Sequence, residues 1–225
     1  MLCEYLNIEY ETTEYEVDVL PDGSYSRQKW FDVKFTLGMD FPNLPYLMDD
    51  ENNVKISESM AIMKYLCRKA GYKGMAGVDD IALAGKAEML EGPVNEIRNQ
   101  FLGVCYMGAS PENWFLENAP GKYKVINDFM GPTKKFLITE NEPTYLDFFL
   151  WEITDHQVMY KPDFLDGQEL TNIKNWYQNF AEIPAVKKYL EANEHRKWPI
   201  NNKMAWGGGN GPSELYKFEK VSGKM

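Results

Sequence analysis

The most informative part of the sequence is FPNLPYLMDD at residues 41–50, which is followed after one hairpin by ESMAI at residues 58–62. Pro45 has no amide hydrogen, so it belongs at the start or the edge of the short apolar strand that follows it. A polar turn then leads to a partner strand at residues 54–56, and a helix begins at Ser59. This arrangement places unpaired strand backbone beside the positive end of a helix, which suits a small zwitterionic peptide.

The composition limits the class of protein. With 225 residues the chain can form one large or two small domains around a sizeable core. Its 34 acidic side chains outnumber the 24 basic ones. This excess argues against nucleic acid or an anionic membrane as the main partner, because phosphate groups attract the opposite charge.

The cysteines and the apolar segments indicate a compartment. Cys3, Cys67 and Cys105 are odd in number, widely spaced and not part of a CxxC pair, which fits neither a disulfide framework nor a zinc site. The N-terminal residues lack the basic flank and the apolar run of a signal peptide, and no stretch reaches the about 20 apolar residues of a membrane helix. We therefore expect a cytoplasmic protein without a membrane partner.

The chain before the hairpin mixes short helices and strands. An apolar stripe over residues 1–6 predicts the last turns of a helix, and residues 12–20 alternate as a half-exposed strand does. Residues 26–34 predict one or two helical turns, on which Trp30 and Lys34 share a face. From these residues alone two interpretations of the pair are open: a packed indole beside a solvated lysine, or a binding role.

The chain divides after the helix that begins at Ser59. A glycine ends this helix, and residues 72–78 contain two more glycines, which predicts a linker. We therefore predict a first domain over residues 1–71, an all-helical domain over residues 79–206 and a flexible tail over residues 207–225.

The second half has a helical period throughout. Apolar residues recur with this period over residues 81–104, where Pro93 is expected to kink the helix. Thr144 and Asp147 have the spacing of a capping box, in which each side chain bonds the backbone amide of the other residue. The helix that follows is apolar on nearly all sides, so we predict a buried central helix in which His156 is a structural residue.

Most catalytic motifs are absent from the sequence. His156 and His195 lie far apart without the spacing of metal ligands, so no metal is expected. The sequence contains no GxGxxG or GxxxxGK phosphate loop and no GxSxG elbow. The three thiols have no obvious neighbouring base. The best candidate is therefore a binding site built from backbone and a few polar side chains.

At this point the sequence resembles a known family. FPNLPYLMDD and KISESMAIMKYLCRK are similar to the glutathione-binding half of cytosolic glutathione transferases, and RQKWFDVKFTLGMDFPNLPYL is closest to the mu class. The similarity continues in EYLNIEYE, in TYLDF and in KMAW near Met204. It implies an α/β thioredoxin-like N-terminal domain followed by an all-helical domain that lines the electrophile site, in a homodimer. It also implies an enzyme that adds the glutathione thiolate to hydrophobic electrophiles, with glutathione as co-substrate and no cofactor.

The resemblance assigns roles to residues in the first domain. It implies that Leu44 pairs through its backbone with the cysteinyl part of glutathione, beside a cis Pro45, and that Asn43 lines the same edge. Trp30 and Lys34 are implied to hold the glycyl carboxylate, which favours the binding interpretation of this pair.

Further roles follow from the same resemblance. Ser59 is implied to bind the γ-glutamyl carboxylate, and Glu58 to accept from the γ-glutamyl ammonium where the mu class usually has glutamine. Glu96 matches an aspartate that reaches the glutathione of the partner subunit, and Phe41 matches an aromatic residue that inserts into that subunit. Tyr106 matches a hydroxyl that assists electrophiles, and a core tyrosine is the other interpretation of this residue.

One departure concerns the start of the sequence. Family members begin with a strand whose tyrosine stabilises the glutathione thiolate, and this strand and tyrosine are absent here. The chemistry needs such help, because a free thiol has a pKa of about 8.5 and only its thiolate is a nucleophile. The strand is interior to the family's sheet, so its loss should expose unpaired edges. Two interpretations follow: a transferase truncated at its start, or a non-catalytic glutathione-binding, ligand-binding or structural relative.

Overall fold

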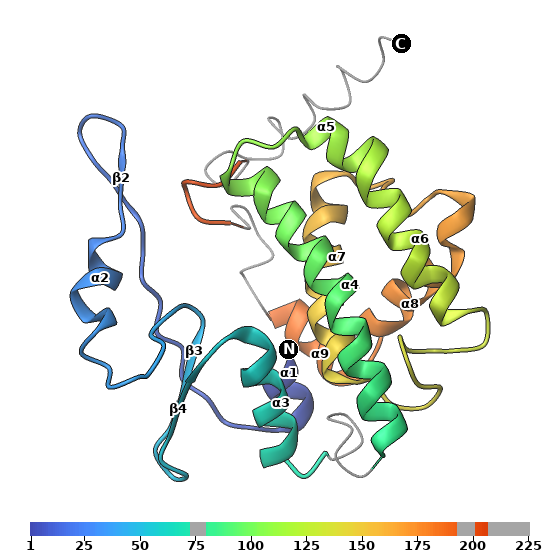
Figure 1. Ribbon diagram of the computed structural model, residues 1–225, viewed down its shortest axis with the longest axis horizontal. Coiled ribbons are helices and arrows are strands. Elements are labelled where there is room, and N and C mark those ends of the chain that lie inside the picture. Colours follow the sequence, from blue (N-terminus) through green and yellow to red (C-terminus); the bar gives the residue numbers. More distant parts are fainter. Residues whose placement is uncertain (73–79, 193–200, 207–225) are drawn as a thin grey trace.

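The computed structural model describes three ranges of the chain, residues 1–72, 80–192 and 201–206 (Figure 1). Most of the predicted linker, the predicted tail and His195 lie outside the described residues.

Three short helices and two hairpins form the N-terminal part, which lies beside a larger helical part (Figure 1). The helices are α1 (Leu2–Leu6), α2 (Gln28–Lys34) and α3 (Ser59–Lys69). The strands pair antiparallel as β1 (Asp18–Val19) with β2 (Tyr25–Ser26) and β3 (Tyr46–Asp49) with β4 (Val54–Ser57). The predicted hairpin and the helix after it are therefore confirmed.

The predicted strand over residues 12–20 is wrong for most of its length. Only Asp18 and Val19 are in a strand, and residues 9–17 belong to no helix or strand. An alternating pattern makes a strand only where the backbone finds a hydrogen-bonded neighbour. In the described part of the chain, β3 pairs with β4 alone, so residues 12–17 have no ladder to join.

The helical part is built around α7. Its main helices are α4 (Ile81–Tyr106), α6 (Ala119–Met130), α7 (Tyr145–Tyr160), α8 (Thr171–Ala181) and α9 (Pro184–Ala192). The shorter segments are α5 (Pro111–Asn113), the π-helix η2 (Trp114–Asn118) and the 3-10 helix η3 (Gln168–Leu170). Figure 1 shows α7 behind α4, with α6 and α8 to the right of these two helices. The long helix predicted over residues 81–104 is confirmed, and it continues through Pro93.

Local sequence explains why α7 is central. Twelve of its 16 residues are buried, so the prediction of a buried helix is confirmed. The predicted capping box is also present. The Thr144 amide donates to Asp147 Oδ2 at 2.7 Å, and the Thr144 side chain accepts from the Asp147 amide. The cap satisfies amides that would otherwise be buried without partners at the start of the helix.

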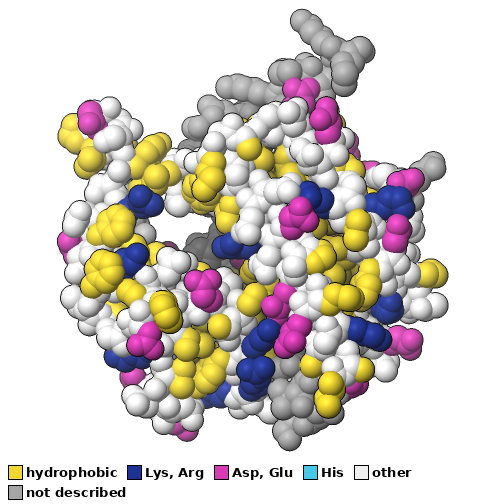
Figure 2. Space-filling view, in the orientation of Figure 1, with side chains coloured by type: hydrophobic (Ala, Val, Ile, Leu, Met, Phe, Trp, Pro, Cys, Tyr) yellow, Lys and Arg dark blue, Asp and Glu magenta, His cyan; other side chains and the backbone are white. Residues whose placement is uncertain are grey.

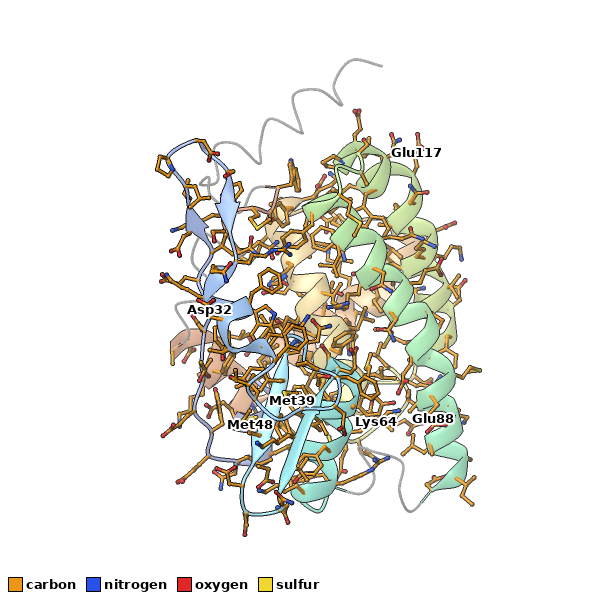
Figure 3. The ribbon with its side chains drawn as sticks, turned by 60° about the vertical axis from the view of Figure 1, so that its left-hand side comes forward. Asp32, Met39, Met48, Lys64, Glu88 and Glu117 are labelled. Atoms are coloured by element: carbon orange, nitrogen blue, oxygen red, sulfur yellow. The ribbon has the colours of Figure 1, made fainter. Side chains whose placement is uncertain are left out.

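A polar contact connects α3 to the helical part. Glu91 of α4 accepts a hydrogen bond from the Tyr145 hydroxyl and forms an ion pair with Lys64, whose Nζ lies 2.5 Å from Glu91 Oε1. Lys64 Nζ also lies 5.5 Å from the centre of the Tyr145 ring. Figure 3 shows Lys64 on the side of α3 that faces α4. Both members of the ion pair are only about one fifth exposed, so solvent screens the contact less than a surface pair.

We expect Glu91→Gln to lower the free energy of unfolding by about 1–2 kcal/mol, because Lys64 and Tyr145 lose a charged acceptor. Urea denaturation followed by circular dichroism measures this change. The matched control is Glu182→Gln, which removes the exposed pair with Lys187 and should change the same quantity by less than about 0.5 kcal/mol. Equal losses in the two variants would contradict the proposed role of Glu91.

Candidate functional site

A cleft of about 1590 Å³ lies between the N-terminal part and the helical part. In Figure 2 the surface is hollowed between these two parts. One wall is the irregular segment 8–15 together with the β3 strand, and side chains along the length of α3 complete this side. The opposite wall consists of side chains from α4 and α7, joined by Asn201. The apolar members of that wall are Phe101, Leu102, Phe149 and Ile153.

Three of the predicted glutathione residues line this cleft: Leu44, Pro45 and Ser59. The peptide bond between Leu44 and Pro45 is cis, as the resemblance implied. Ser59 is the first residue of α3, and Glu58 before it has a φ of 74°. A strand edge and a helix N-terminus therefore lie side by side in the wall of the cleft. The backbone amides in the first turn of such a helix have no hydrogen-bond partner within the helix.

Trp30 and Lys34 lie outside the cleft lining. Trp30 is 7% exposed and packs between two tyrosines, with ring centres 5.1 Å from Tyr15 and 6.0 Å from Tyr46. The hydroxyls of these tyrosines lie 2.9 Å apart, and both residues do line the cleft. Lys34 Nζ lies 5.4 Å from the centre of the Phe35 ring. The indole is thus packed, one layer behind the cleft wall.

Four other predicted residues are also outside the lining: Phe41, Asn43, Glu58 and Glu96. Phe41 is 81% exposed on the loop before β3, and its carbonyl accepts from the Ser57 hydroxyl at 2.5 Å. Glu96 accepts from Lys122 Nζ at 2.7 Å and from the Gln100 amide at 3.2 Å. Its carboxylate is therefore already paired within the chain.

Tyr106 ends α4 and is 41% exposed, although it is not among the residues that line the cleft. Its hydroxyl donates to Asn201 Oδ1 at 3.3 Å and accepts from Asn202 Nδ2 at 3.4 Å. Partial burial raises the pKa of Tyr106, so at neutral pH the hydroxyl keeps its proton and can donate it. Asn201 lines the cleft and was missed from the sequence, where only the nearby KMAW stretch marked this region.

Three further titratable groups of the cleft have shifted pKa values, those of Asp49, Cys3 and Cys105. Lys69 Nζ, at 2.5 Å, and the Tyr65 hydroxyl, at 2.6 Å, hold the pKa of Asp49 well below its usual range. Burial raises the pKa of Cys3, and it raises that of Cys105 to about 12. Both cleft thiols are therefore protonated at neutral pH and are weak nucleophiles.

Two other kinds of site were searched for in the described residues. Within them, no group of three or more His, Cys, Asp and Glu side chains could hold a metal ion. None of the helices in the described ranges is long and apolar enough to cross a bilayer.

His156, which the sequence predicts to be a structural residue, lines the cleft, where a bound molecule can contact it.

Known proteins resemble this chain over most of its length. Residues 1–68 match the family model of the glutathione S-transferase N-terminal domain, and residues 95–193 match that of the C-terminal domain. Glutathione S-transferase Mu 3 of Homo sapiens is 35% identical over 212 residues, which cover 92% of this chain and 88% of that protein. Glutathione S-transferase Mu 5 of Rattus norvegicus is 36% identical over 211 residues, with the same coverage.

Solved structures agree on the fold. The crystal structure of the glutathione S-transferase Blo t 8 superposes with a TM-score of 0.68 and 28% identity, over 91% of this chain and 90% of that one. The predicted fold, a thioredoxin-like N-terminal domain with few strands followed by a helical domain, is confirmed.

Proposed function

The chain belongs to the glutathione S-transferase family, and from this premise we propose that it binds glutathione in the cleft and joins the thiolate to hydrophobic electrophiles. The observation that carries the proposal is the position of Leu44 and Ser59 on one side of a single cleft whose opposite wall contains an apolar patch. Such a cleft accommodates a charged tripeptide and an apolar second substrate together.

The glutathione side of the cleft is built from backbone. The chain at Leu44, which leads into the edge of β3, offers main-chain groups to the cysteinyl part of the tripeptide, as in strand addition. Ser59 and the first amides of α3 then bind the γ-glutamyl carboxylate, where the helix dipole favours negative charge. We also propose that Glu58 and Asn43 support this edge, and that Trp30 and Lys34 act on the glycyl end.

The electrophile side contains an apolar patch beside the polar side chains of Arg98, Glu152 and His156. Phe101, Leu102, Phe149 and Ile153 provide the surface against which a hydrophobic electrophile packs. The neutral Tyr106 hydroxyl then assists electrophiles on which negative charge develops. No cofactor enters this scheme.

We also propose that two copies form a cytoplasmic homodimer, in which Phe41 inserts into the partner and Glu96 reaches across to the partner's glutathione. The exposure of Phe41 supports the first contact. Glu96 would have to leave Lys122 and Gln100 to make the second. Light scattering of the purified protein tests the assembly, and a monomeric mass would contradict it.

A second candidate function is glutathione binding without catalysis. It is supported by the raised pKa of Cys3 and Cys105, because these two cleft thiols stay protonated near neutral pH and do not take the proton of the glutathione thiol. Burial is the main cause of the raised pKa of both thiols.

Two measurements separate these candidates. Retention on immobilised glutathione, with elution by free glutathione, tests the binding that both share. Conjugation of 1-chloro-2,4-dinitrobenzene, with the upstream strand of the family restored and without it, tests catalysis. Retention with conjugation supports the transferase, and retention without conjugation in both forms supports the second candidate. Failure to bind in both forms overturns both.

A further inference from the structure

One side of the central helix α7 borders the cleft and carries a histidine. The residues of α7 that line the cleft are Phe149, Glu152, Ile153 and His156. Their spacing of three or four residues places them on one face of the helix. His156 is only partly buried, although most of α7 is buried, so its imidazole is accessible from the cleft.

Contacts at its two ends place His156 along this wall. The Arg98 guanidinium of α4 lies 6.0 Å from the centre of the Phe149 ring, at the start of the α7 face. At the other end, Asn201 Nδ2 donates to the Tyr160 hydroxyl oxygen at 3.2 Å. Tyr160 follows His156 by about one helical turn, so His156 lies toward the Asn201 end of the wall.

The chemistry of the cleft requires a group that accepts a proton, because a free thiol has a pKa of about 8.5 and only its thiolate attacks an electrophile. Cys3 and Cys105 have raised pKa values and keep their own protons. Asp49 accepts from Lys69 and Tyr65, and its lowered pKa makes it a weak base. An imidazole is the side chain that ordinarily accepts a proton near neutral pH. Among the described residues that line the cleft, His156 has the one imidazole.

We infer that His156 is a catalytic residue that accepts the proton of the glutathione thiol. The inference rests on the proposed function and names the base for its first step. Leu44 and Ser59 hold the tripeptide on the opposite wall, and a side chain of a paired strand stands out from its sheet, so the cysteinyl thiol projects into the cleft. The sulfur–hydrogen bond breaks, the proton moves to the imidazole, and the electron pair stays on sulfur. The thiolate then forms the carbon–sulfur bond, an aryl halide loses its halide with the bonding electron pair, and the imidazolium returns the proton to water.

Other charged groups share the cleft with His156. They are Arg98 of α4, Glu152 of α7 and, on the opposite wall, Lys69 with the carboxylates of segment 8–15 and of the β3–β4 hairpin. Carboxyl, ammonium, guanidinium and phenol groups ordinarily titrate outside the range of about pH 5–9. Within that range the pH dependence of the reaction therefore reports the imidazole and the glutathione thiol.

The first test is a pH profile of kcat/KM for glutathione in the 225-residue chain, with 1-chloro-2,4-dinitrobenzene as the second substrate. The unaltered protein should lose activity only as the pH falls through the range in which an imidazole titrates, about pH 6–7. His156→Gln should react only with glutathione that is already ionised, about 3% of it at pH 7 for a thiol pKa of about 8.5. We therefore expect a loss of about 10- to 30-fold at pH 7 and of less than about threefold at pH 9.5. A loss of equal size at every pH, or no loss, would overturn the inference.

Two further measurements separate a base from a structural residue. Added imidazole should restore conjugation by His156→Ala in proportion to the concentration of neutral imidazole, because the free base enters the open cleft and replaces the side chain. S-hexylglutathione has no thiol proton, so calorimetry should find its affinity for His156→Gln within about twofold of that for the unaltered protein. Intact binding without rescue would overturn the inference and leave the proposed function standing. Binding without conjugation in the unaltered protein would overturn the inference and support the second candidate. If S-hexylglutathione binds neither protein, the proposed function fails and the inference falls with it.

Discussion

Asp147→Ala should lower the free energy of unfolding by about 3–5 kcal/mol, which is a large part of the stability of a typical domain. Asp147 is fully buried and accepts four hydrogen bonds. The donors are the Leu137 amide at 2.8 Å, the Thr144 amide at 2.7 Å, the Thr144 hydroxyl at 2.9 Å and the Trp176 indole at 2.9 Å. The alanine leaves all of these donors buried without this acceptor, and it removes the side-chain half of the capping box that Asp147 supplies.

Urea denaturation followed by tryptophan fluorescence measures this loss. Asp166→Ala is the matched control, since it removes an exposed carboxylate that pairs with the exposed Lys174, and it should change stability by less than about 0.5 kcal/mol. Asp147→Asn should fall between the two, because it keeps the shape and one acceptor oxygen but turns a donor toward other donors. A loss below about 1 kcal/mol in Asp147→Ala would mean that this network contributes little to the fold.

The same network shows which parts of the fold could be predicted from the sequence. Thr144 and Asp147 are three residues apart, so their contact follows from local rules of helix capping. The β3–β4 hairpin was predictable for the same reason, because its two strands are joined by a short turn. The Trp176 indole, which donates to the same carboxylate, lies 29 residues further along the chain, and no local pattern marks it.

The strand predicted over residues 12–20 is wrong because strand formation depends on a partner that the local sequence does not contain. The alternation of apolar and polar residues indicates which side chains can face a core, whereas a strand forms only if another strand supplies hydrogen bonds. In the described residues that partner is missing, and the side chains of Tyr15 and Tyr46 meet instead across the gap between this segment and β3. The amphipathic pattern is present, but a distant part of the chain decides whether it becomes a strand.

The candidate site divides in the same way. Leu44, Pro45 and Ser59 lie within sixteen consecutive residues, and the resemblance marks all three. The contact between Tyr106 and Asn201 spans 95 residues, and the ion pair between Glu96 and Lys122 spans 26. Such pairs depend on how α4 packs against distant segments. The sequence therefore located the glutathione side of the cleft better than the electrophile side.

Ser59→Ala should weaken the binding of glutathione by about 10- to 100-fold, since a hydrogen bond to a charged group contributes about 1.5–3 kcal/mol and each 1.4 kcal/mol is tenfold in affinity. Ser59 begins α3 inside the cleft, where its hydroxyl and the helix amides can meet one carboxylate. The change removes only the hydroxyl, so the helix itself should persist.

Calorimetric titration with S-hexylglutathione measures this affinity without requiring turnover. Ser110→Ala is the matched control, because Ser110 also stands at a helix start, where its hydroxyl accepts from the Asn113 amide at 3.2 Å, but it lies outside the cleft. Both variants should keep the circular dichroism spectrum of the unaltered protein, and only Ser59→Ala should lose affinity. An affinity of Ser59→Ala within about threefold of that of the unaltered protein would contradict this prediction, because the loss would be smaller than the contribution of one hydrogen bond to a charged group. The γ-glutamyl carboxylate would then have to bind elsewhere in the cleft.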